Sequence, residues 1–240
     1  MANPLDQFTI KPIVPIEVAG ANVSFTNSSL FMGLAVLCVL GLFYFAGRHA
    51  TLVPGRLQSL VEVVYEFILG IIDDNVGKEG RRYFSYIITL FMFILFGNLL
   101  GMIPGSFTFT SHIIVTFAMA IVVVGAVTVI GFKRHGLHFL SLFAPSGVPV
   151  YIYPLLIPIE ILSYLVRPVS LSVRLAVNMT AGHILMKSFA GFVLAMGVFG
   201  VLPLLVAVGL TGLEFAIAFL QAYVFTVLAC LYLNDALHLH

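Results

Sequence analysis

Long apolar runs without a charged residue are the feature that most constrains how this chain can fold. Residues 29–47, 83–103 and 112–132 contain no Lys, Arg, Asp or Glu. At a rise of about 1.5 Å per residue, such runs are long enough to cross a hydrocarbon core of roughly 30 Å. Over the whole chain 61% of the residues are hydrophobic and 9% are charged, whereas a soluble domain has about 25% charged residues. The sequence therefore excludes a soluble globule and predicts an all-α, polytopic membrane protein.

Basic residues at the ends of these runs predict their orientation. They gather at residues 48–56, 78–82 and 133–134, whereas the loop that joins the second run to the third has none. Cytoplasmic loops are enriched in Lys and Arg, so we expect these three segments on the cytoplasmic side and the N-terminus outside. Residues 83–132 are then a transmembrane hairpin that turns at Pro104-Gly105, and residues 29–47 are the first span.

Residues 57–76 have a different pattern, with apolar residues at helical spacing and Glu62, Glu66 and Asp73 between them. We expect an amphipathic helix here. It can lie along the membrane surface, or it can be a water-side helix that packs on loops of the protein itself.

The last third of the chain is apolar but contains polar residues at membrane depth. Residues 151–190 are interrupted by Glu160, Arg167, Arg174, Asn178, His183 and Lys187, and the stretch from 192 to 234 has one charged residue before its end, Glu214. The latter stretch is too long for one upright crossing, so it must tilt or break, with Pro203 and Gly209 as candidate bends. We expect residues 151–234 to form two long tilted helices, and residues 1–240 to form a single membrane domain.

Arg174 is the polar residue that most needs a reason. A guanidinium keeps its charge in proteins, and one at the bilayer centre costs about 2.5 to 3.5 kcal/mol on insertion scales. Ser170 and Asn178 lie one helical turn to either side of it on the same face. Arg167, which precedes Pro168, is interpreted as structural.

His183 and Glu214 form the second constellation. His183 is nine residues after Arg174 and so points to the opposite side of a regular helix. A lone buried carboxyl such as that of Glu214 requires a partner, and His183 is the natural one. With Gln221 two turns after Glu214, two antiparallel helices can present Arg174 and Gln221 toward one surface and hold His183 and Glu214 in a wet cleft. The alternative is a purely structural role, in which these groups only join helices by hydrogen bonds.

These residues resemble the a subunit family of F-type ATP synthases. The similarity is carried by RLAVNMTAGH at 174–183, preceded by Glu160 and PVSLSV. It extends over most of the chain and takes in the PGR segment and amphipathic helix near 54–76, GNLLGMIPG at 97–105 and LQAYVFTVLACLYL at 220–233.

The resemblance implies roles for particular residues. Arg174 occupies the position of the essential arginine that faces the carboxylate of the rotating c ring, and His183 and Glu214 occupy the positions of an ionisable pair. Asn178, Gln221, Glu160 and Ser170 match further polar positions. Gly101 is a departure, since many members have an aspartate near there.

The mechanism that follows is a pair of proton half-channels that meet the c ring on either side of Arg174, with His183 and Glu214 relaying protons on the outer side. The expected partners are the c ring, b-type peripheral stalk subunits, the other ATP synthase subunits and lipid, in a bacterial or mitochondrial inner membrane. We expect no cofactor or metal, and the net charge of +1 offers no basic stripe for nucleic acid.

Two other classes of protein fit the sequence less well. A secondary transporter or ion channel would also keep an Arg and a His/Glu pair in the membrane, but the two halves of the chain show no repeat. An intramembrane enzyme is disfavoured because the chain has no HExxH or GxSxG motif, and it has no GxxxxGK[ST] phosphate loop for ATP. The chain is therefore expected to be a non-catalytic subunit.

Overall fold

A computed structural model describes residues 9–15, 17–18, 21–22, 24–48, 51–103, 106–143 and 150–238. The turn predicted at Pro104-Gly105 lies outside these residues. The described part of the chain is dominated by helices, and five of them are long and apolar enough to cross a membrane. The expected all-α, polytopic membrane fold is confirmed.

Short strands precede the first helix, which the sequence did not predict. β1 (Pro12–Val14) pairs antiparallel with β4 (Phe25–Thr26), and β2 (Glu17–Val18) pairs with β3 (Ala21–Asn22). These pairs are two or three residues long and form no core, so they leave the helical class of the fold unchanged.

The first four helices follow the hydropathy of the sequence. α1 (Asn27–Arg48) covers the first apolar run, α2 (Arg56–Asn75) the amphipathic segment, α3 (Phe84–Gly101) the second run and α4 (Ile113–His135) the third. A short 3-10 helix, Lys78–Tyr83, joins α2 to α3, and another, Gly136–Phe143, follows α4. α3 packs mainly on α6 and α4 mainly on α5, rather than on each other.

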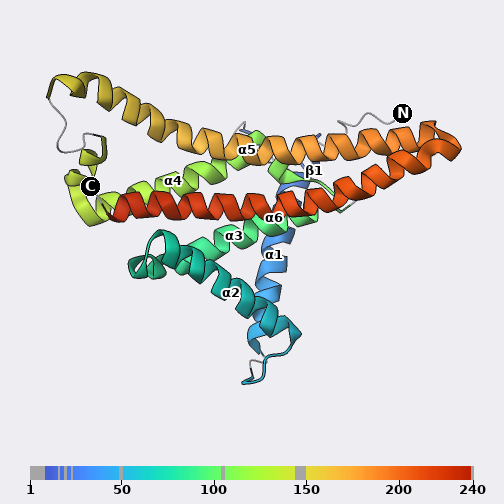
Figure 1. The fold of residues 1–240 in the computed structure, drawn as a ribbon, viewed down its shortest axis with the longest axis horizontal. Coiled ribbons are helices and arrows are strands. Elements are labelled where there is room, and N and C mark those ends of the chain that lie inside the picture. Colours follow the sequence, from blue (N-terminus) through green and yellow to red (C-terminus); the bar gives the residue numbers. More distant parts are fainter. Residues whose placement is uncertain are drawn as a thin grey trace.

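The last two helices are the longest. α5 (Tyr153–Ala195) and α6 (Val201–Leu237) are antiparallel neighbours, and Figure 1 shows them running side by side across the direction of α1. With 43 residues, α5 is about 64 Å long, roughly twice the thickness of a hydrocarbon core, so an upright orientation is excluded. α5 continues through Pro158 and Pro168.

The break in the last apolar stretch differs from the one we expected. The chain turns at Gly197–Gly200, where Gly197 has φ 54°, a left-handed conformation that favours glycine. Pro203 lies in the first turn of α6, where a proline is tolerated, and Gly209 lies within a continuous helix. The break therefore precedes both candidate bends, Pro203 and Gly209.

α2 packs on the bundle through only part of its length. Its C-terminal half packs on the bundle and buries Ile68, Ile71 and Ile72. Its N-terminal half leaves Leu57 and Leu60 about half exposed, at 54% and 51%. The apolar side of α2 thus packs into the protein core at one end of the helix and is exposed on the surface of the chain at the other.

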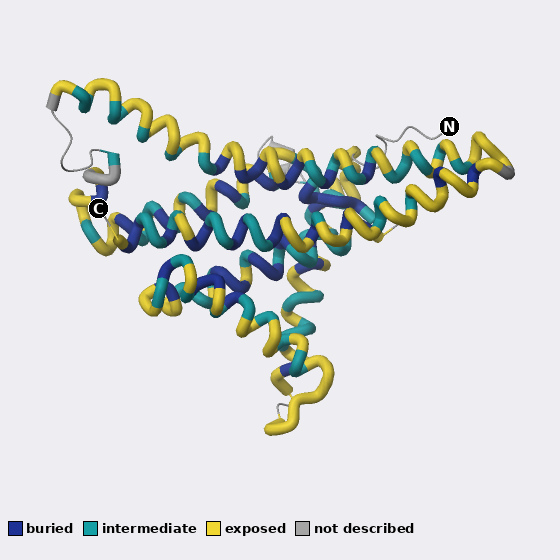
Figure 2. Tube along the Cα trace, viewed as in Figure 1, coloured by how far each residue is buried: buried dark blue, intermediate teal, exposed yellow. Residues whose placement is uncertain are grey.

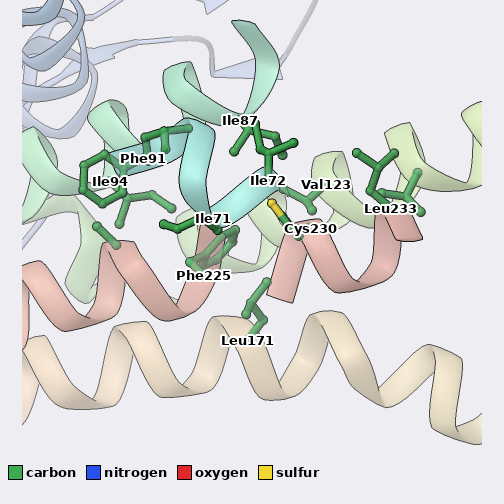
Figure 3. Packing of buried hydrophobic residues seen from close by; sticks show 14 of the residues in the cluster. Ile71, Ile72, Ile87, Phe91, Ile94, Val123, Leu171, Phe225, Cys230 and Leu233 are labelled. Atoms are coloured by element: carbon green, nitrogen blue, oxygen red, sulfur yellow. The ribbon is translucent and has the colours of Figure 1, made fainter. Parts of the chain in front are cut away.

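The core lies where α2, α3, α4 and α5 meet the C-terminal half of α6 (Figure 3). Ile72, Phe91, Val123, Leu171 and Phe225 contribute from these five helices in turn. Figure 2 shows the buried residues gathered along the middle of the bundle and the C-terminal half of α6, whereas the N-terminal end of α5 and the region where α5 turns into α6 are largely exposed.

Candidate functional site

The loop 106–112, which joins α3 to α4, folds back against α3 and closes one side of the site. A side chain at Gly97 or Gly101 would collide with it, since a Cβ there would lie 2.5 Å from the Phe109 ring and 2.6 Å from Thr108. Thr180 on α5 donates a hydrogen bond to the carbonyl oxygen of Ser111, at 3.3 Å. Two small residues on α3 and one hydroxyl on α5 therefore hold this loop between the two helices.

His183 is buried on α5 and faces this loop. Its Nε2 lies 2.9 Å from the hydroxyl oxygen of Thr108. The same hydroxyl donates to the carbonyl oxygen of Gly101, at 3.1 Å, and a carbonyl can only accept. A threonine has one hydroxyl proton, so Thr108 accepts from an N–H at Nε2 and the lone pair of a neutral His183 is at Nδ1.

That lone pair points toward Glu214 on α6. Nδ1 of His183 is 3.7 Å from Oε1 of Glu214, and the two residues are only 6% and 3% exposed. This distance is too long for a hydrogen bond, and neither carboxyl oxygen of Glu214 has another hydrogen-bond partner among the described residues. A proton can therefore pass between them only after a small side-chain rotation.

A small cavity adjoins Glu214 between α5 and α6. Its volume is about 140 Å³, and Asn178, Gly182 and Glu214 supply its polar and glycine lining, with five apolar residues around them. Gly182 is needed there because a Cβ at this position would lie 2.6 Å from Oε1 of Glu214. The expected cleft around the pair is thus an enclosed packing of side chains with a small space beside the carboxyl group.

A larger cavity of about 480 Å³ lies on the neighbouring face of α5, toward the loop 106–112. Ser111 and His112 line it from the loop, and Val177, Thr180 and Ile184 line it from α5. It shares Ala181 with the smaller cavity, so the two cavities lie on adjacent faces of α5.

Arg174 lies in the middle of α5 and is exposed. It forms no hydrogen bond or ion pair within the described part of the chain, and the neighbouring Ser170 and Val177 are exposed on the same face. Asn178, expected on this face, is half-buried and turns into the smaller cavity. The open face around Arg174 therefore carries a fixed positive charge that the chain itself does not neutralise.

Two other predicted site residues lie elsewhere. Gln221 is buried at 8% exposure, so it does not share an exposed surface with Arg174 as we expected, because the C-terminal half of α6 is covered by the core. Glu160 is half-buried and fourteen residues before Arg174, about 21 Å along α5. The structure thus brings His183, Glu214 and Asn178 together, and leaves Glu160 apart from them.

Arg167 has a complete set of partners. Its NH1 is 3.0 Å from Oδ2 of Asp235 on α6, and its guanidinium lies over the rings of Tyr164 and Tyr232 at 5.6 and 5.0 Å. The structural role that we assigned to it fits these contacts.

Sequence reasoning missed the residues that α3 and the loop 106–112 contribute. Asn98 donates to the carbonyl oxygen of Ala218, one turn after Glu214, at 3.2 Å. Thr108 contacts His183, and His112 stacks on Phe107. One hydroxyl and one amide in an apolar stretch are a weak sign of a functional residue in a single sequence, although the motif GNLLG at 97–101 contains Asn98.

Within the described ranges, no group of three His, Cys, Asp or Glu side chains is placed to hold a metal ion.

Comparisons with known proteins agree over the full chain. A family model described as ATP synthase A chain matches residues 29–234. The chain is 59% identical over 241 residues to the ATP synthase subunit a of Rhodospirillum rubrum, and the match covers 100% of both proteins. It is 56% identical to the ATP synthase subunit a of Paramagnetospirillum magneticum, again over 100% of both, and 56% identical to that of Rhizobium etli over 98% of this chain and 97% of the relative.

Proposed function

This chain belongs to the family of ATP synthase A chains, the non-catalytic, proton-translocating a subunits of F-type ATP synthases, and on that premise we propose which residues carry the protons. The chain is a multi-pass membrane subunit of the ATP synthase complex. The transporter or channel considered from the sequence is set aside, because the match covers the whole chain.

Arg174 is the charge that meets the moving carboxylate of a rotor ring. The observation that carries this proposal is its exposed guanidinium on a membrane helix, with no acidic partner among the residues that the structure describes. A carboxylate that approaches a fixed cation is favoured in its charged form, so it releases its proton on arrival. Because the cation stays in place, it also blocks direct passage of protons between the two sides.

Glu214 and His183 form the relay on one side, and Thr108 orients the imidazole. A protonated Glu214 can give its proton to Nδ1 of His183 once a small side-chain rotation closes the distance of 3.7 Å. The imidazolium then gives up one of its protons to water in the half-channel. The hydroxyl of Thr108, 2.9 Å from Nε2, only accepts a hydrogen bond, because its own proton is donated to the carbonyl oxygen of Gly101. Imidazole suits this role because its ordinary pKa lies near neutral pH.

The two cavities support two half-channels within the helix pair of residues 151–234. The larger one, beside Ser111 and Thr180, approaches His183, and the smaller one ends at Asn178 and Glu214. Ser170 belongs to the exposed face around Arg174. We assign Gln221 and Glu160 to the proton path by resemblance, Gln221 from within the core and Glu160 toward the other end of α5.

The partners follow from the same proposal. A ring of c subunits occupies the open face around Arg174, and b-type peripheral stalk subunits hold the chain against rotation. The complex resides in an energy-coupling inner membrane, that of a bacterium or a mitochondrion, because proton transfer can drive rotation only across a membrane that is energised. Moving one charge through a membrane potential of 100 mV supplies about 2.3 kcal/mol.

The test is the substitution Arg174→Ala in the assembled complex, with proton-driven ATP synthesis and passive proton flow measured in membrane vesicles. We expect synthesis to fall by at least about a hundredfold, as when a preorganised charge is removed from an active centre. Passive flow should persist or increase, because the block between the half-channels is removed.

Val173→Ala is the matched control, since it truncates an exposed side chain next to Arg174 that lines neither cavity. It should leave synthesis near the wild-type rate. Co-purification of all subunits shows that each variant assembles. Synthesis at a normal rate in an assembled Arg174→Ala complex would contradict the assignment.

A further inference from the structure

A cavity at the cytoplasmic end of the bundle is unrelated to the proton path. It has a volume of about 690 Å³ and lies where the 3-10 helix Lys78–Tyr83 meets the C-terminal end of α4. Figure 1 shows these two segments close together at one end of the molecule. The lining consists of Lys78, Glu79, Arg82, Tyr83, Ile130, Lys133 and Arg134.

The lining is strongly cationic. It holds four basic side chains and one carboxylate, a net charge of +3. Glu79 is paired with Arg134, and the nearby Arg81 and Asp73 are paired with each other at 2.6 Å. Lys78, Arg82 and Lys133 form no ion pair with any described residue. Like charges repel when they are gathered, so this arrangement favours a bound anion.

The positive-inside rule explains why these residues lie on this side of the membrane, but it does not explain their convergence. That rule requires only basic residues in cytoplasmic loops, wherever they are placed. Here Lys78 and Arg82 come from the 3-10 helix Lys78–Tyr83, and Lys133 comes from the last turn of α4, some fifty residues later. The fold joins them in one cavity. The Glu79 and Arg134 pair fixes the two segments to each other.

The remaining wall of the cavity identifies the kind of anion. Tyr83 and Ile130 line it at the points where α3 and α4 begin and end their apolar runs. Val129 and Phe132 beside Ile130 are exposed, at 53% and 39%. A phosphate at the cations would therefore have an apolar surface next to it, on the membrane side. Basic pockets between membrane helices on the cytoplasmic side suit lipid headgroups.

We propose that this cavity binds the phosphate of an anionic phospholipid. Lys78, Arg82 and Lys133 contact the headgroup, and the acyl chains lie along Tyr83, Ile130 and the exposed side of α4. The bound lipid joins the start of α3 to the end of α4, two helices that make few contacts with each other. It thereby supports the bundle on which α6 and the proton relay rest.

The test measures retained lipid by native mass spectrometry. The full-length chain and the assembled complex are each taken from nanodiscs of phosphatidylglycerol mixed with phosphatidylcholine. The variant Arg82→Gln with Lys133→Gln removes two cavity charges. The matched control, Arg48→Gln with Arg56→Gln, removes two exposed arginines from another cytoplasmic loop. A third variant, Arg82→Lys with Lys133→Arg, keeps the charge and tests whether any loss comes from misfolding.

We expect one phosphatidylglycerol to be retained in preference to phosphatidylcholine by the wild type, the control and the charge-conserving variant. The Arg82→Gln, Lys133→Gln variant should lose that preference by about 25-fold, because each basic residue near an anionic surface contributes about fivefold.

Several results would overturn the proposal. An equal loss in the control would show general surface attraction only. Displacement of the lipid by excess inorganic phosphate would show a site for the free ion. Preference in the isolated chain but not in the assembled complex would show that another subunit covers the cavity.

Discussion

Two arginines two helical turns apart on α5 have opposite surroundings. Arg167 contacts Asp235 at 3.0 Å and lies between the rings of Tyr164 and Tyr232. Arg174 is exposed, and no described residue pairs with it. Both lie in an apolar segment, where an uncompensated charge is costly. One arginine is satisfied by its own chain, and the other requires a group that the chain does not supply.

The carboxyl groups of α6 repeat this contrast. Asp235 is held by Arg167, whereas Glu214 is buried without a hydrogen bond within the described part of the chain and has only His183 near it, at 3.7 Å. Groups that pair within the chain hold helices together, and groups left open can exchange protons or meet a moving partner. Changes at open groups should therefore reduce activity more than stability, and changes at closed pairs should do the reverse.

The largest effect is expected for Glu214→Gln. Loss of the ionisable group should lower ATP synthesis in reconstituted vesicles by about a hundredfold, the scale of a lost acid–base group. The thermal midpoint of the complex should not fall, because a buried carboxyl without a hydrogen bond contributes little stability. Asp235→Asn is the comparison, and a greater loss of synthesis in Asp235→Asn would reverse the proposed division.

The next effect concerns the space beside Glu214. Gly182→Ala places a methyl group 2.6 Å from Oε1 of Glu214 and should move the carboxyl group away from His183. We expect synthesis to fall about tenfold, the cost of roughly 1.4 kcal/mol in the proton transfer. Gly191→Ala is the matched control on the same helix, since a Cβ there has no neighbour within 4 Å. Partial recovery in Gly182→Ala with Glu214→Asp would identify the cause as steric, and an unchanged rate in Gly182→Ala would contradict it.

A smaller effect is expected at the closed pair. Arg167→Gln should lower the free energy of unfolding by about 1 kcal/mol, because the ion pair with Asp235 is partly exposed and the two ring contacts add modestly. A double-mutant cycle with Asp235→Asn measures the coupling between the two side chains. Synthesis should change little. If Arg167→Gln stopped synthesis without loss of stability, Arg167 would belong to the open groups.

The smallest effect concerns Asp73, outside the membrane helices. A side-chain hydrogen bond from Arg81 lowers the pKa of Asp73 below its ordinary value. A lowered pKa in the folded state stabilises the fold above the ordinary value, near 3.9, and this contribution is lost as the pH falls through the folded value. This contribution should thus be fully present around neutral pH and should not change with pH there. Arg81→Gln should raise the pKa of Asp73, measured by NMR of a labelled carboxyl carbon, and Lys78→Gln should raise it less, since Lys78 acts only through its charge at longer range. A larger shift in Lys78→Gln would contradict the assignment.

The sequence by itself determined the helical class, the apolar spans and the residues worth examining. Runs such as 83–103 cannot be placed in water, and Arg174, His183 and Glu214 are conspicuous because their surroundings in the sequence are apolar. The periodicity of a helix also placed Arg174 and His183 on different faces before any contact was known.

Only the tertiary structure decided which polar groups meet. Thr108 and Asn98 reach His183 and α6 from 75 and 120 residues away, and no local pattern encodes such distances. The core covers Gln221, which periodicity alone would have left beside Arg174, and the turn at Gly197 shortens α6 at a place that hydropathy does not mark. Hydropathy depends on each residue and its neighbours along the chain, whereas burial and pairing depend on where distant segments pack.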